Sequence, residues 1–176
     1  HLDIAWDYAT WSTVINIRLP RILAAFFVGA ALATAGAAYQ GMFQNPLVSP
    51  DILGASSGAG FGAALAIFMD LGPVWITAFA FAGAVICVGA AYAVSRFTKG
   101  SATLSMVLAG ILVSSLFTAM TSFLKTVADT EDQLPEITYW LMGSLAGADM
   151  GDVIFAGTLI IAGIVSIFLL RWRMNV

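Results

Sequence analysis

Five long stretches without a charged side chain constrain the fold of this 176-residue chain more than any other feature. At a rise of about 1.5 Å per residue, a helix of about 18–25 residues covers the thickness of a hydrocarbon core. A soluble core helix would carry a polar face, and these stretches show none. They also lack the alternation expected of membrane β-strands. The uncharged stretches are residues 22–50, 52–69, 71–95, 100–124 and 153–170.

These stretches predict an all-α fold: a polytopic transmembrane helix bundle with about five spans, forming a single transmembrane domain over residues 1–176. Their length and their content of alanine, leucine, isoleucine and phenylalanine favour helices over strands. The predicted spans are about residues 22–40, 52–69, 74–95, 102–124 and 153–170.

Shorter segments flank the predicted spans. Residues 1–21 carry three aromatic side chains, and we expect them to form an external segment that rests at the membrane interface. Residues 137–148 are apolar but only 12 long, which predicts a short re-entrant or interfacial helix.

A helix start signal precedes the second predicted span. It consists of Ser49 as N-cap, Pro50 at the first helical position and Asp51 in the first turn.

The composition excludes several classes of function. Hydrophobic residues make up 60% of the chain and charged residues 10%, and the mean hydropathy is +0.94. These values exclude a disordered chain, a nucleic-acid binder built on basic patches and almost any water-soluble enzyme. Cys87 is the one cysteine and His1 the one histidine of the sequence, which leaves no internal disulfide, cysteine metal cluster or histidine-based catalysis. We therefore expect a chain that is not an enzyme and binds no metal, cofactor or nucleic acid.

Small residues recur at four-residue spacing in the first two predicted spans. Such stripes let helix backbones approach closely, which drives association where water supplies no hydrophobic force. The same faces could instead line a passage, and both interpretations stay open. The glycines expected to pack helices are Gly29, Gly36, Gly41, Gly54, Gly58 and Gly62.

The predicted spans carry hydroxyls and amides but no charged side chain. Proton pumps, voltage sensors and ion-coupled carriers normally keep an ionisable group in the membrane. A passage lined by hydroxyls and amides could let a bulky solute slide, with the driving energy supplied elsewhere. Hydrogen bonding between helices is the alternative role for these groups. Gln40 and Gln44 share one helix face by their spacing.

The distribution of basic residues only weakly favours one orientation of the chain in the membrane. With five alternating spans, one side of the membrane carries four basic residues and the other side three. The four are Arg96, Lys99, Arg171 and Arg173, and the three are Arg18, Arg21 and Lys125. If the first four residues are cytoplasmic, the pair Arg18 and Arg21 is external, against the usual bias. The pair either anchors at lipid headgroups or has a function of its own.

A series of motifs, in order along nearly the whole chain, resembles the FecCD family. Members of this family are permease subunits of binding-protein-dependent importers for ferric siderophores, haem and cobalamin. The motifs are residues 18–21 (RLPR), 36–41 (GAAYQG), 45–47 (NPL), 50–54 (PDILG), 56–60 (SSGAG), 108–111 (LAGI) and 139–145 (YWLMGSL).

The resemblance implies a larger assembly. Family members have about ten membrane helices per subunit and work as a pair, with two cytoplasmic ATPases that hold ATP and Mg²⁺ and a soluble substrate-binding protein outside. The chain begins without a methionine, and by this comparison it lacks the first helix and about the second half. The expected function is ATP-driven import of a metal chelate through a bacterial or archaeal cytoplasmic (inner) membrane. A passive channel or a membrane scaffold subunit is the alternative.

The resemblance also implies roles for particular residues. Arg18 and Arg21 are similar to external arginines that pair with carboxylates of the binding protein. The turn before the fourth span resembles a cytoplasmic gate, with Leu104 standing where family members carry a second hydroxyl. The resemblance implies Gln40, Gln44 and Asn45 for the translocation pathway and Thr103 and Leu104 for the gate. Ser56 and Ser57 are added to the pathway residues because they are hydroxyls within a predicted span.

Overall fold

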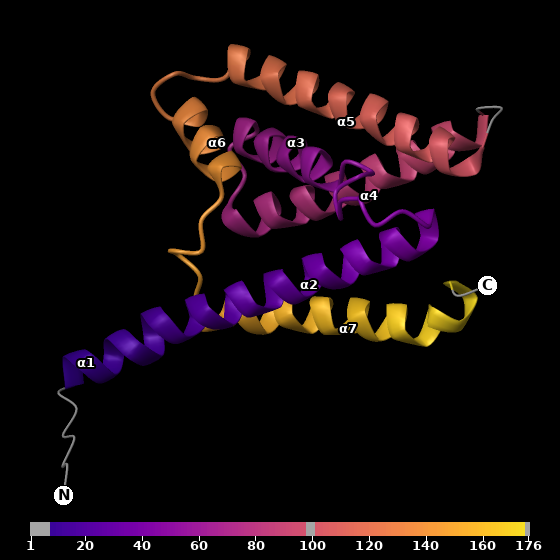
Figure 1. The fold of residues 1–176 in the computed structure, drawn as a ribbon. Coiled ribbons are helices and arrows are strands. Elements are labelled where there is room, and N and C mark those ends of the chain that lie inside the picture. Colours follow the sequence, from indigo (N-terminus) through magenta and orange to yellow (C-terminus); the bar gives the residue numbers. More distant parts are fainter. Residues whose placement is uncertain (1–7, 98–100, 175–176) are drawn as a thin grey trace, which may run out of the picture. The chain divides into compact units, whose positions relative to one another are not determined.

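The computed structural model describes residues 8–97 and 101–174, and in these residues every regular element is a helix (Figure 1). The all-α prediction is therefore confirmed. The elements are α1 (Tyr8–Thr13), a π-helical turn η1 (Val14–Arg18), α2 (Leu19–Phe43), α3 (Ala55–Phe68), α4 (Pro73–Phe97), α5 (Ala102–Val127), α6 (Gln133–Met142) and α7 (Met150–Met174).

Four helices in the described part of the chain are long and apolar enough to cross a membrane: Thr10–Phe43, Pro73–Phe97, Thr103–Val127 and Met150–Arg171. The second predicted span, residues 52–69, differs from the structure. Its helix, α3, begins at Ala55 and has 14 residues. At 1.5 Å per residue α3 is about 21 Å long, which is shorter than a hydrocarbon core of about 30 Å.

The structure has no boundary between an interfacial segment over residues 1–21 and the first span. Residues 1–7 lie outside the described residues, and from Tyr8 the helix continues through α1 and η1 into α2. Pro20 would clash with a carbonyl of the preceding turn in a regular α-helix. The wider turn of η1, in which the Leu19 N–H donates to the Val14 carbonyl, lets the helix pass through this proline.

Two helix ends near glycines also differ from the sequence expectation. The short helix α6 covers Gln133–Met142 instead of residues 137–148, because Gly143 takes a φ of 71° and ends it. At the start of α3, Gly54 takes a φ of 74°, so the helix begins after it and not at Ser49 or Pro50. Asp51 still caps the helix, but from the preceding turn: its Oδ1 accepts the Ser56 N–H at 2.8 Å.

The chain divides into two compact units. One contains residues 1–48 and 144–176, where α2 and α7 lie side by side (Figure 1). The Phe27 ring of α2 covers Gly157 of α7, so closely that a methyl group at Gly157 would lie 3.1 Å from the Phe27 Cε2. On α2, Gly36 is buried. No atom of the described chain outside the local helix lies within 4 Å of a methyl group placed at Gly29 or Gly41, so a packing role for these two stays a prediction.

The other unit, residues 49–143, packs α3 against both α4 and α5. Gly58 lies against the backbone of Gly83 on α4, and Gly62 lies against the Phe79 carbonyl. This close approach is possible because neither glycine has a side chain. Small and branched residues fill the core of the unit, which α6 closes with the fully buried Ile137. The core residues are Ala63, Ala64, Ala66, Ile67, Ile76, Ala80, Leu124, Ala128 and Ile137.

Candidate functional site

The first candidate group, Arg18 and Arg21, lies where η1 passes into α2, and both side chains are exposed. The Arg21 Nη2 donates a hydrogen bond of 3.0 Å to the Ala146 carbonyl, which ties the start of α2 to the segment that leads into α7. The Arg18 side chain forms no hydrogen bond or ion pair with another described residue. The two arginines therefore differ: Arg21 has a structural contact, whereas the guanidinium of Arg18 is available to a partner.

The second candidate group, Gln40, Gln44 and Asn45, lies at the other end of α2, and all three side chains are exposed. Gln44 ends the helix in the left-handed conformation with a φ of 49°. The Gln40 Nε2 donates to the Val48 carbonyl at 3.4 Å, and the Asn45 Oδ1 accepts the Leu47 N–H at 3.0 Å. Two of these side-chain amides, those of Gln40 and Asn45, thus form hydrogen bonds that stabilise the turn after α2.

The structure does not bring the arginines and the amides together. Arg21 and Gln40 are 19 residues apart on one helix, which corresponds to about 29 Å. This distance is close to the thickness of a hydrocarbon core. The two groups therefore lie at opposite faces of the membrane if α2 spans it.

Ser56 and Ser57 lie in the first turn of α3, where Ser56 is exposed and Ser57 is half-buried. A methyl group at Gly54, just before this turn, would lie 2.5 Å from the Ser114 Cβ and 3.3 Å from the Cys87 Sγ. Ser114 and Cys87 lie near the middle of α5 and α4. The serines thus begin a helix at mid-depth of their unit, a position that nothing in the local sequence indicates.

A ladder of hydroxyls follows α5. Ser114 is half-buried, and the other members are exposed. Each hydroxyl donates to a carbonyl of α5 itself, such as Thr118 to Ser114 at 2.9 Å and Ser122 to Thr118 at 3.0 Å. These hydroxyls satisfy their donors within one helix and do not bridge helices in the described part of the chain. The ladder consists of Ser114, Ser115, Thr118, Ser122 and Thr126.

The expected gate residues, Thr103 and Leu104, lie in the first turn of α5, and both are exposed. At 1.5 Å per residue, Thr103 is about 17 Å along α5 from Ser114. The gate residues are thus separate from the serines at the start of α3. Their role stays a prediction.

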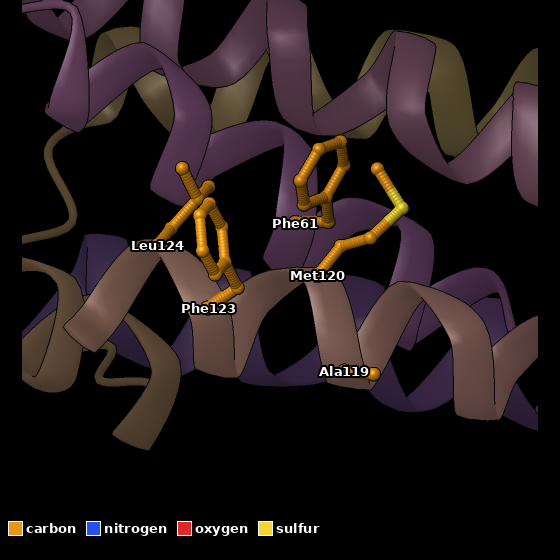
Figure 2. Close-up of a pocket in the computed structure, with 5 residues that line it drawn as sticks. All are labelled: Phe61, Ala119, Met120, Phe123 and Leu124. Atoms are coloured by element: carbon orange, nitrogen blue, oxygen red, sulfur yellow. The ribbon is translucent and has the colours of Figure 1, made fainter. Parts of the chain in front are cut away.

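An open hollow of about 440 Å³ lies between α3 and α5 (Figure 2). Apolar side chains line it, and none of the expected site residues is among them. The described residues also contain no cluster of histidine, cysteine, aspartate or glutamate that could hold a metal ion. The hollow is lined by Phe61, Ala119, Met120, Phe123 and Leu124.

Long apolar helices with many large hydrophobic side chains on their outer faces define a multi-pass membrane protein. Comparison with known families is more specific: the family model of the FecCD transport family matches residues 3–176. The chain belongs to this family, and the resemblance seen in its motifs is confirmed.

Several curated relatives are permeases. MolB of Haemophilus influenzae, a molybdate import system permease protein, is 37% identical over 171 residues, which cover 96% of this chain and 50% of MolB. The cobalamin import system permease protein BtuC of Halobacterium salinarum is 38% identical, over 92% of this chain and 43% of BtuC. The hemin transport system permease protein HmuU of Yersinia pestis is 36% identical, over 87% of this chain and 47% of HmuU.

A solved structure supports the same relationship. It is an inward-facing conformation of an ABC transporter described as of metal-chelate type, with a TM-score of 0.88 and 34% identity, and the match covers 99% of this chain and 56% of that chain. The chain spans about half the length of the curated relatives it matches.

Proposed function

We propose that this chain is part of a permease subunit that imports a metal chelate through the bacterial or archaeal cytoplasmic membrane. The observation that carries the proposal is membership of the FecCD transport family over residues 3–176. The substrate class is that of iron–siderophore complexes, haem and cobalamin. ATP hydrolysis takes place on a separate cytoplasmic ATPase that holds ATP and Mg²⁺, so the permease has no catalytic residue and binds no cofactor.

In this proposal Arg18 and Arg21 face the outside and receive the substrate-binding protein. An arginine suits this role because its guanidinium pairs with a carboxylate in a bidentate and oriented way. The exposed guanidinium of Arg18 supports a direct contact. The bond from Arg21 to the Ala146 carbonyl supports a second task, which is to hold the neighbouring external segment in place.

The residues proposed for the passage are polar groups within each of the two units, and the passage itself lies beside a second permease subunit. Gln40, Gln44 and Asn45 lie at one end of α2, and Ser56 and Ser57 start α3. The hydroxyl ladder of α5 adds a polar surface to the passage. Because its hydroxyl groups already donate to carbonyls of α5, this surface is hydrated but does not hold a solute tightly. Thr103 and Leu104 form the cytoplasmic gate at the start of α5.

The test uses the full-length permease, co-expressed with the ATPase and the binding protein encoded beside it. After purification and reconstitution into liposomes, uptake of haem, cobalamin, ferric siderophores and molybdate is measured with and without ATP. Uptake that requires both ATP and the binding protein supports the proposal. Solute flux without nucleotide indicates a passive channel, and a complex that moves no solute and recruits no ATPase indicates a scaffold subunit. Either result would overturn the proposal.

A further inference from the structure

The non-helical turn of residues 49–54 lies at mid-depth of the helices around it. Gly54 contacts Ser114 of α5 and Cys87 of α4, and the Ile52 carbonyl packs against Gly110 of α5. Cys87 is about 21 Å from one end of α4 and about 15 Å from the other, at 1.5 Å per residue. Ser114 is likewise about 17 Å from Thr103 and about 20 Å from Val127. Since α4 and α5 are long enough to span the membrane, the turn lies inside the hydrocarbon depth.

Backbone groups at this depth need hydrogen-bond partners, and the turn satisfies several of its own. The Ile52 N–H donates to the Ser49 carbonyl at 3.2 Å, and the Gly54 N–H donates to the Asp51 carbonyl at 2.9 Å. Non-helical backbone is tolerated in membranes only where it is buried in protein or lines a water-filled cavity. For the turn as a whole, both environments are possible.

The side chain of Asp51 indicates whether the turn is buried in protein or lines a water-filled cavity. Its carboxylate is held near the start of α3 by the Ser56 N–H at 2.8 Å, yet the residue is exposed. It forms no ion pair with another described residue. A carboxylate at mid-depth is costly against lipid, so such groups almost always face a bundle interior or a water-filled cavity. The sequence places this charge between two uncharged stretches and gives no sign of its depth.

We propose that Asp51 faces the water-filled part of the passage and gives it a negative potential at this level. The inference rests on the proposed function, because it needs the exposed face of the turn to be the passage. The hydrogen bond to Ser56 fixes the position of the carboxylate, so the charge stays at one level of the passage.

The test measures the potential directly and needs no knowledge of the substrate. A cysteine placed by Ser56→Cys in the full-length permease, assembled with its ATPase, is reacted in membranes with a cationic and an anionic methanethiosulfonate of similar size. The protein without this substitution gives the background, to which Cys87 contributes little because it is fully buried. Each reagent's rate is divided by its rate with a free thiol in solution, and a unit charge about 7 Å away in water then favours the cationic over the anionic reagent by about sevenfold. We expect that ratio with Asp51 and a ratio near one after Asp51→Asn.

The Asn side chain keeps an oxygen that accepts the Ser56 N–H, so Asp51→Asn removes the charge and preserves the cap. If that variant does not assemble, Asp51→Ser removes the charge with a smaller polar side chain and serves instead. The control site is Thr130→Cys, in the loop after α5, where the reagent ratio should be the same with and without Asp51.

Two results overturn the inference. One is a ratio at Ser56→Cys that does not change when the charge is removed. The other is a Ser56→Cys thiol that neither reagent reaches although Thr130→Cys reacts, which would place lipid, another helix or the second subunit against the turn. Failure of the proposed function is distinguished by ATP-dependent uptake through the unsubstituted permease, which does not depend on the reagent ratio.

Discussion

The contact between α3 and α4 at Gly62 predicts the effect of adding a single methyl group. A Cβ at this position would meet the Phe79 carbonyl oxygen, and it would lie 2.6 Å from the Phe79 carbonyl carbon and 3.1 Å from the Ala80 Cα. All three are backbone atoms of a 25-residue helix, so no side chain can rotate away. Gly62→Ala must therefore push the two helices apart.

The magnitude follows from two opposing effects. Overpacking a tight core costs about 1–3 kcal/mol. Replacing glycine by alanine inside a helix returns about 1 kcal/mol through helix propensity. Gly29→Ala is the matched control, because a methyl group there meets no atom of the described chain outside its own helix within 4 Å and keeps only the favourable effect. The difference between the two variants is thus the overpacking cost, about 1–3 kcal/mol.

The assay is thermal unfolding of the full-length permease in detergent, followed by the loss of the monodisperse peak in size-exclusion chromatography. We expect Gly62→Ala to unfold about 2–10 °C below Gly29→Ala, by the usual relation between stability and midpoint. Equal midpoints for the two variants would refute the reasoning, because they would show that α3 and α4 are not held at backbone contact.

Two further changes test other parts of the molecule. Arg18→Glu should weaken binding-protein affinity about tenfold or more at low salt through charge repulsion, and Arg18→Lys less; unchanged affinity in a pull-down titration would remove the docking role. Gly54→Ala should lower the unfolding midpoint more than Gly62→Ala, because it combines a φ of 74° with a contact 2.5 Å from the Ser114 Cβ, and a midpoint equal to that of the unsubstituted protein would contradict this.

Much of the fold could be predicted from where charges are absent. The stretches predicted as the third, fourth and fifth spans lie within α4, α5 and α7, which extend a few residues beyond them. This worked because each stretch is long and apolar, and the energy of placing a residue in lipid is mostly a local property of that residue. The family could be recognised for a similar reason, since its motifs are local patterns of sequence.

The start of α3 could not be predicted in the same way. The residue types at the start of a helix are also found in turns, and the local sequence does not distinguish the two at Ser49, Pro50 and Asp51. Gly54 determines where the helix begins. Its φ is in the left-handed region, and in this conformation it lies in close contact with Ser114 and Cys87. These contacts join residues that are distant in sequence. The roles of the expected docking, pathway and gate residues likewise stay predictions, because they depend on partners outside this chain.

The sequence by itself determined that this is a multi-pass helical membrane protein of a transport family, since charge-free length and short motifs are properties of single segments. Only the tertiary structure decided which glycines pack, because Gly58 and Gly62 face α4 whereas Gly29 and Gly41 meet no such surface in the described chain. It also decided that the turn before α3, which carries Asp51, lies beside the middle of α4 and α5. Depth in a membrane is set by the helices that a residue lies beside, and a linear pattern does not contain that information.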